Sequence, residues 1–375
     1  MSDRLLPCAT RRSIIAAGLM GSLAFAVHAR GATPVLTVPR VDSLNLVVID
    51  DAATFGPFLP NLALPGLSVE RAGISGPSRM SRMSPHTLLG EFGLSLLAES
   101  RMADQTRRVL VDFGYSQEVL TNNMTLLGID ADRIDAAVLS HGHLDHYGGY
   151  AALFRGNSAV KPRLPVTVGG EEAFCERVAL LGDPPPVMGT LDRPALAHAG
   201  LDVRIRPNPV IVADHGFTTG TIPLNSPERA AIPTQMRPGI GCDRNLLSAA
   251  KRSVNQLPDD GEHELATCYA VKGLGLVVIA SCSHRGVINS VHRAQAVSGI
   301  ERVHAVIGGF HLVRPRTDDE ARWTVAEFAR IDPTYIIPMH CTGETFIAEA
   351  LRLMPQKIVR SYVGSHFKFV ANAAS

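Results

Sequence analysis

The sequence predicts an α/β protein in which apolar strands end at loops that carry histidine. Three short runs of aliphatic side chains are expected to form buried strands. They lie at residues 135–140, 276–280 and 335–339. A histidine follows each run, at His141, His284 and His340. Because ligands gather where loops leave the carboxyl ends of strands in α/β proteins, we expect the three loops to meet at one site.

The first of these loops has the densest cluster of metal-binding side chains. Residues 139–149 read LSHGHLDHYGG and contain His141, His143, Asp145 and His146. Neutral imidazole and carboxylate are ligands of divalent metals such as zinc, and a catalytic site keeps one position open for water. The spacing is typical of a two-metal hydrolase. The alternative is a histidine-rich turn that binds nothing, but burying four titratable groups without a cation would be costly.

The other two histidines lie in similar local contexts. His284 follows the apolar run in the segment SCSHRG, and His340 follows the last run in the segment HCTG. Either histidine alone would be weak evidence, because a lone histidine beside an apolar strand is more often a core or surface residue. Their shared position just past a strand end favours metal binding.

These motifs resemble the metallo-β-lactamase superfamily, whose hallmark is His-x-His-x-Asp-His followed by two distant histidines. The resemblance implies a four-layer αββα sandwich, an α+β arrangement in which helices flank two mixed β-sheets. It also implies two metal sites, one held by His141, His143 and His284, the other by Asp145, His146 and His340. Asp112, in the segment VLVDFG, matches the early aspartate that orients the ligands from behind.

Within the superfamily, the chain resembles the 7,8-dihydropterin-6-ylmethyl-4-(β-D-ribofuranosyl)aminobenzene-5′-phosphate synthase-like branch. The segments that carry this resemblance are 91–97, 126–130, 282–286, 308–312 and 339–343. There are two departures from the pattern of the branch. Phe92 stands where many relatives have histidine, and Glu264 stands near an expected glutamine. Either residue could alter the substrate pocket.

The segment GGFH at residues 308–311 follows another expected strand, at 303–307. Most two-metal relatives have a bridging aspartate here, so in this chain a hydroxide alone would bridge the metals. His311 could bind a metal, donate a hydrogen bond to an oxyanion or cap the turn, and these three roles remain open.

The resemblance implies catalysis by hydroxide bound to two metals. Such metals lie roughly 3.5–4 Å apart, lower the pKa of a shared water and polarise the substrate. Asp145 would orient the hydroxide, and His311 or an arginine would stabilise charge on the substrate. Arg285, beside His284, is a candidate contact for a phosphate, although arginines on loops are usually solvated.

The N-terminus predicts an export signal. Arg11 and Arg12 precede an apolar stretch at 14–27, and Ala29 suits cleavage by a signal peptidase. The stretch is shorter than the roughly 20 residues that span a bilayer. We therefore expect a twin-arginine signal at 1–29, export by the twin-arginine machinery to the periplasm, and no stable membrane anchor after cleavage. An uncleaved anchor is the alternative.

We expect residues 30–375 to form a single domain with a loop-rich insertion at about 156–261. The insertion is rich in proline and glycine, and we interpret it as the cover of the pocket. A short helix is expected at 171–181, and turns and extended connections at 218–241.

Without Cys8, which lies in the expected signal, the cysteines are odd in number and irregular in spacing. We therefore expect buried packing rather than disulfides, with a thiolate ligand as the alternative for Cys282 and Cys341.

The charge balance excludes one class of partner. The net charge is +1, from 36 basic and 35 acidic residues, so the chain lacks the field that recruits nucleic acid.

The expected function is hydrolysis of a small molecule, a phosphoester, lactone or related ester, with two divalent ions as cofactors. Zinc is the default metal, and iron or manganese also suit the ligands. The alternatives are a transferase of the synthase type and a metal-binding protein without catalysis.

Overall fold

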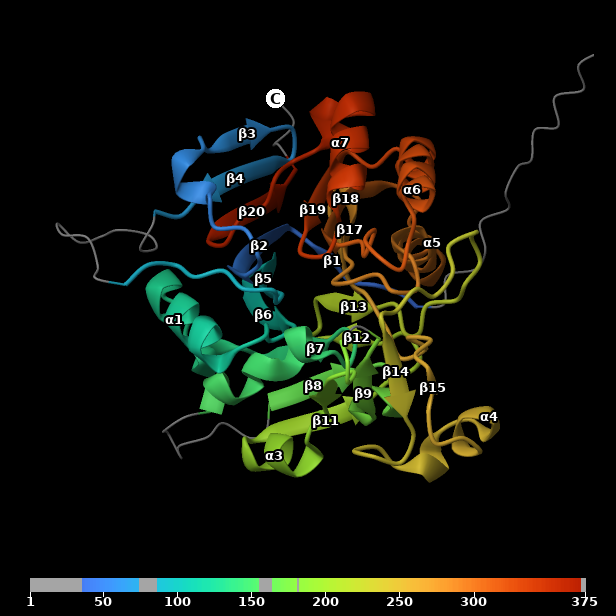
Figure 1. Ribbon diagram of the computed structural model, residues 1–375. Helices are drawn as coiled ribbons and strands as arrows, with labels where there is room; N and C mark the ends of the chain where they lie inside the picture. The colour runs from blue at the N-terminus through green and yellow to red at the C-terminus, as the bar shows by residue number, and fades with distance from the viewer. Residues whose placement is uncertain (1–35, 74–85, 155–163, 181, 372–375) are drawn as a thin grey trace, which may run out of the picture. The chain divides into compact units, whose positions relative to one another are not determined.

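The computed structural model describes residues 36–73, 86–154, 164–180 and 182–371 (Figure 1). The signal expected at 1–29 lies outside these residues. All the described residues belong to one compact unit. No helix among them is long and apolar enough to cross a membrane.

The first β-sheet has nine strands and mixed direction. Its strands in spatial order are β11 (Leu201–Ile205), β8 (Leu164–Val168), β7 (Ala136–Leu139), β6 (Gln105–Val111), β5 (Ser95–Met102), β2 (Ser43–Asp50), β20 (Ser365–Val370), β4 (Leu67–Arg71) and β3 (Leu62–Leu64). The neighbouring pairs β6–β7, β7–β8 and β8–β11 are parallel, and the other neighbouring pairs of this sheet are antiparallel. Strand β7 confirms the strand expected at 135–140.

The second sheet has seven strands. Six of them are, in order, β12 (Ile211–Val212), β13 (Gly216–Thr218), β16 (Thr267–Val271), β17 (Gly275–Ile279), β18 (Val303–Gly309) and β19 (Tyr335–Met339), and β1 (Arg40–Val41) pairs with β16. Strands β17, β18 and β19 are parallel neighbours, and they confirm the other three predicted strands.

Alternate side chains along a strand of the second sheet face either the first sheet or the helices. Val277 and Ile279 of β17 pack in a core with Val48 and Val138 of the first sheet. The alternate residue Val278 packs instead in a cluster with helix residues. Successive side chains on a strand point to opposite faces, so a strand that is apolar throughout is buried on both sides. The two sheets therefore pack face to face.

Helices cover the outer faces of the two sheets. On the first sheet, α1 (Gln117–Leu127) packs Leu120 and Met124 against Leu110 of β6. The helices on the second sheet are α5 (Val287–Ser298), α6 (Asp318–Ile331) and α7 (Glu344–Leu353), which cluster beside its parallel strands (Figure 1). This arrangement confirms the predicted αββα sandwich.

The region at 156–261 contains more regular structure than its composition predicts. It supplies β8 and β11 to the first sheet and β12 and β13 to the second, together with α3 (Arg193–His198) and α4 (Ala249–Arg252). It also builds a small third sheet. The strands of that sheet are β10 (Val187–Gly189), β9 (Glu176–Ala179), β14 (Thr234–Arg237) and β15 (Leu257–Pro258).

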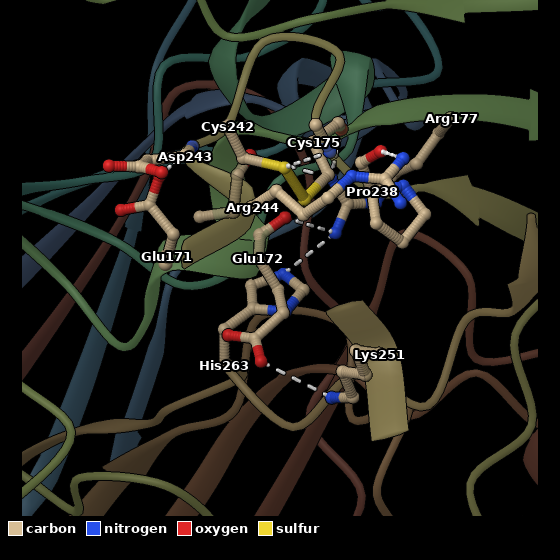
Figure 2. The surroundings of a disulfide bond; sticks show 12 residues. Glu171, Glu172, Cys175, Arg177, Pro238, Cys242, Asp243, Arg244, Lys251 and His263 are labelled. Atoms are coloured by element: carbon tan, nitrogen blue, oxygen red, sulfur yellow. Dashed lines mark hydrogen bonds and ion pairs between the residues drawn. A yellow bond between two sulfur atoms is a disulfide. The ribbon is translucent and has the colours of Figure 1, made fainter. Parts of the chain in front are cut away.

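Two expectations for this region are wrong. The helix expected at 171–181 is a 3-10 turn, Glu171–Phe174, followed by β9, because pairing with β14 outweighs the local pattern. Cys175 and Cys242 form a disulfide, although buried packing was expected for both (Figure 2). Their spacing of 67 residues contains no sequence signal for the pairing. The free cysteines Cys268, Cys282 and Cys341 are buried.

Candidate metal centre

The predicted ligands lie at one end of the two packed sheets. His141 and His143 follow β7 of the first sheet, and the short helix α2 (Leu144–Tyr147) carries Asp145 and His146. The remaining two follow strands of the second sheet, His284 after β17 and His340 after β19. The packing of the two sheets thus brings the six side chains together.

The six side chains form two adjacent groups of donor atoms. One comprises His141, His143 and His284, and the other comprises Asp145, His146 and His340. Within each group the donor atoms lie within 4.8 Å of one another. The two groups adjoin where the rings of His141 and His146 have centroids 4.2 Å apart. These are the two sets that the resemblance implies.

Several buried nitrogen atoms at this centre make no hydrogen bond with the part of the chain that the structure describes. The buried Nε2 atoms of His141 and His146 make no hydrogen bond with any described residue. Two further nitrogens face other atoms that could bind a metal. His284 Nε2 lies 3.2 Å from His143 Nδ1, and His340 Nε2 lies 3.3 Å from Asp145 Oδ2. Since unpaired buried polar atoms are costly, this donor set fits two divalent cations.

Burial sets the protonation of the first group. Desolvation lowers the pKa of His141, His143 and His284, and the neighbouring histidines lower that of His141 and His284 further. These imidazoles are therefore neutral near pH 7, which is the form that binds metals.

Attraction between the partners has the larger effect in the second group. Burial alone would raise the pKa of Asp145, but His146 and His340 hold it below its usual value. Burial would also lower the pKa of His340, but Cys341 and Asp145 raise it to about 9. A metal at this group would therefore displace a proton from His340.

Asp112 lies behind the first ligand loop, where the resemblance places it. Its carboxylate accepts hydrogen bonds from the backbone N–H and the hydroxyl of Ser140, at 2.7 and 2.8 Å. The same carboxylate lies 2.8 Å from His146 Nδ1, which leaves the other ring nitrogen free for a metal. Ser140 Oγ is also 3.0 Å from His141 Nδ1, so Asp112 orients ligands of both groups.

A second buried carboxylate, Asp259, lies behind His143. His143 Nε2 is 3.2 Å from Thr234 Oγ1 and 3.6 Å from Asp259 Oδ2, so its Nδ1 is the atom that faces the centre. The guanidinium of Arg177 donates to the same carboxylate oxygen at 2.7 Å, and both side chains are buried. Sequence reasoning missed these residues because they lie in the region without periodic pattern.

The disulfide is part of the support for Arg177. The guanidinium donates to the carbonyls of Cys175 and Glu172 at 2.8 and 2.9 Å, and it lies 3.3 Å from His263 Nε2 (Figure 2). That nitrogen also accepts a hydrogen bond from the backbone of Gly142, between the first two ligands. Burial and Arg177 lower the pKa of His263 well below its usual value, so the ring is neutral and can accept.

Glu264 holds the second ligand loop, although the sequence marks it only as a departure from the branch. Its two carboxylate oxygens accept hydrogen bonds from the backbone N–H groups of His284 and Arg285, each at 2.7 Å. The side chain of Arg285 donates to the carbonyls of Ile222 and Asp260. In the structure Arg285 therefore joins loops, and its contact with substrate stays a prediction.

His311 and Phe92 lie against the two histidines from the second sheet. The ring of His311 has its centroid 4.2 Å from that of His284, and its Nε2 has no partner among the described residues. Phe92 lies over His340 with centroids 4.7 Å apart and is 59% exposed. His311 thus has a free nitrogen beside the first group, and Phe92 gives the second group an apolar neighbour.

Comparison with known proteins agrees with this fold. Residues 91–169 match the model of the metallo-beta-lactamase superfamily, which covers the first ligand loop. This part of the chain is thus similar to the metallo-β-lactamase superfamily, whose members generally bind divalent metals.

Two curated relatives come from Methanocaldococcus jannaschii. One is named 7,8-dihydropterin-6-methyl-4-(beta-D-ribofuranosyl)-aminobenzene-5′-phosphate synthase, and it is 27% identical over 72% of this chain and 90% of its own length. The other is an uncharacterised protein, 25% identical over 68% of this chain and 84% of its own length.

A solved structure, described as a metal-dependent hydrolase of the beta-lactamase superfamily, has a similar fold. Its TM-score is 0.61 at 23% identity, and the match covers 86% of this chain and 98% of that one. At this identity the likeness concerns the fold alone.

Proposed function

We propose that this protein is a hydrolase that depends on two divalent metals and acts on a phosphoester, lactone or related ester. The observation that carries the proposal is the pair of adjacent donor groups, His141, His143 and His284 beside Asp145, His146 and His340. Two cations held there would lower the pKa of a water molecule and polarise the substrate oxygen. Zinc is the expected metal, and iron or manganese suit the same donors.

The protein's own residues would orient the ligands and carry protons. Asp112 and Asp259 fix the rings of His146 and His143 from behind, so that one nitrogen of each faces the centre. The unpaired Nε2 of His311 can donate to the charge that develops on the substrate. Asp145 would serve both as a ligand and as the group that orients the attacking water.

We place this hydrolase in the periplasm, after export by the twin-arginine machinery and cleavage after Ala29. The paired arginines and the apolar stretch at 14–27 support this location. The disulfide between Cys175 and Cys242 supports it as well, because disulfides persist mainly in oxidising compartments. A small molecule, phosphorylated or neutral, would be the substrate, and nucleic acid would not be a partner.

A transferase of the synthase type is the second candidate function. The relative that carries the synthase name matches over 90% of its own length, and this broad match supports the candidate. Such an enzyme would join a dihydropterin alcohol, or an activated form of it, to an aminobenzene ribotide. The proposed export argues against it, because those substrates are biosynthetic intermediates expected inside the cell.

Turnover and metal content, measured on the same sample, test these proposals. Phosphomonoester, phosphodiester, lactone and thioester substrates should reveal hydrolysis that needs metal and disappears in Asp145→Ala. The matched control is Asp202→Ala, which removes a carboxylate that pairs with Arg204 at the surface. Condensation of a dihydropterin with an aminobenzene ribotide, without hydrolysis, would favour the transferase. Bound metal without any turnover would favour a binding protein, and absence of bound metal would overturn both enzymatic proposals.

A further inference from the structure

Cys282 is a buried thiol at the boundary between the two donor groups. It lies two residues before His284 in the loop that follows β17. Its sulfur is 3.5 Å from His311 Nδ1 and 3.2 Å from the sulfur of Cys341, the residue after His340. The thiol thus lies among the ligand loops and belongs to none of the six predicted ligand positions.

The Cys282 sulfur is close to donor atoms of both groups. It belongs to three sets of possible ligands, and within each set the donor atoms lie within 4.8 Å of one another. The other members are His141 and His146 in one set, His284 and His311 in another, and His340 and Cys341 in the third. Two of these histidines belong to the first donor group, and two belong to the second. A single sulfur atom with neighbours in both groups lies where one ligand can serve two metals.

Metal geometry is compatible with that position. Ligand atoms on one tetrahedral zinc lie roughly 3.5 Å apart, because the bonds to nitrogen and sulfur are about 2.0–2.3 Å long. Donors within 4.8 Å can therefore close on shared ions with small side-chain adjustments. No carboxylate occupies the segment at 308–311, and Phe310 in that segment is buried in the cluster under the helices. Among the described residues around this boundary, the sulfur is thus a candidate for a bridging donor.

We propose that the Cys282 thiolate is a ligand shared by both metals, an inference that rests on the proposed two-metal centre. On binding, the thiol releases its proton to solvent and the sulfur lone pairs bond to the two cations. A soft sulfur donor favours zinc or iron over manganese or magnesium. The proposal therefore also narrows the choice of metal.

X-ray absorption at the zinc edge tests the proposal on the unaltered protein. The full chain is loaded with zinc, and its zinc content is measured on the same sample. A shared thiolate gives one sulfur neighbour per zinc, at about 2.3 Å. Half a sulfur per zinc would mean a ligand on one metal only, and no sulfur would mean a packing role; either result overturns the proposal. Two zinc ions without sulfur would leave the two-metal centre intact, whereas absence of zinc would overturn both.

Cobalt substitution assigns the sulfur to a residue. Thiolate bound to cobalt(II) gives a charge-transfer band in the near ultraviolet, which should disappear in Cys282→Ser. The band should persist in Cys341→Ser and in the control Cys268→Ser, whose buried thiol lies on β16. Loss of the band in Cys341→Ser but not in Cys282→Ser would overturn the assignment. Alkylation and peptide mapping of the metal-loaded protein should find Cys282 as a thiol. A disulfide between Cys282 and Cys341 would also overturn the assignment of the sulfur ligand to Cys282.

Discussion

At the scale of single residues, Asp259 determines how His143 is presented to a metal. Burial alone would raise the pKa of Asp259, but Arg177 and His143 hold it well below its usual value. The carboxylate is therefore charged near neutral pH, and it fixes the ring through Nε2. A change at Asp259 alters the orientation of a ligand without removing the ligand.

We predict that Asp259→Asn weakens metal binding at the first donor group by about 10- to 100-fold. The amide keeps the shape of the side chain but loses the charge that pairs with Arg177 and orients His143. Competition with a chromophoric chelator measures the affinity. The control is Asp202→Asn, at the surface, which should bind metal as the wild type does. Equal affinity in both variants would contradict the orienting role.

Asp50, at the end of β2, gives a prediction about pH. Burial, and then repulsion from Glu91, raise its pKa to about 8 from an ordinary value of 3.8. Between these two values the folded protein keeps a proton that the unfolded chain has released. The stability that the protonated Asp50 side chain contributes is therefore complete below about pH 4 and is lost as the pH rises to 8.

Asp50→Asn should therefore stabilise the protein increasingly as the pH rises. We expect the two proteins to be alike at about pH 4 and the variant to be more stable by on the order of 5 kcal/mol at about pH 9. Urea unfolding at both pH values, on metal-free protein, gives the difference. Asp42→Asn is the control, since this exposed carboxylate pairs with Lys272 and should give no gain at high pH.

At the scale of elements, the disulfide joins the turn Glu171–Phe174 and β9 to the loop after β14. It closes a loop of 67 residues, and a cross-link of this length restricts the unfolded chain. The segment that it fixes also supplies the carbonyl groups that hold Arg177.

Replacement of both Cys175 and Cys242 by serine should lower the free energy of unfolding by about 2–4 kcal/mol. Chemical denaturation without metal measures this loss separately from any effect on metal binding. A reductant should destabilise the wild type and leave the double variant unchanged. If the reductant acted equally on both proteins, the disulfide would not be the cause.

The strands and the supporting residues differ in how far the sequence predicts them. Aliphatic runs such as 276–280 and 335–339 predict strands well, because burial on both faces requires apolar side chains throughout. Strand β9 could not be predicted, since its partner β14 is distant in the chain. The same holds for the disulfide and for Arg177, whose role depends on contacts that only the folded chain makes.

At the scale of the whole molecule, four of the six predicted ligands could be named from the fixed spacing of the segment at 141–146, and His284 and His340 could be named because each follows an apolar run. Asp112 was identified for the same reason, through its segment at 109–114. Asp259, His263 and the role of Glu264 could not be, because they act through hydrogen bonds across the fold. A local motif thus predicts the donors, whereas the groups that orient them become visible only in the structure.

Removal of metal should destabilise the whole protein. Without cations the buried donor atoms lose their partners, and a ligand that binds only the folded state stabilises it by mass action. We expect treatment with a chelator to lower the melting temperature by at least about 5 °C, and added zinc to restore it. Calorimetry measures the shift. Asp145→Ala should show a smaller one, and equal shifts in both proteins would contradict binding at this centre.

Neither sheet carries a complete donor group. The first sheet supplies His141 and His143 to one group, and the second completes it with His284; His340 completes the other group in the same way. Each half of the sandwich alone therefore leaves both donor groups incomplete. We expect tight metal binding to require the docking of the two halves, so that metal affinity would report whether the sandwich has assembled.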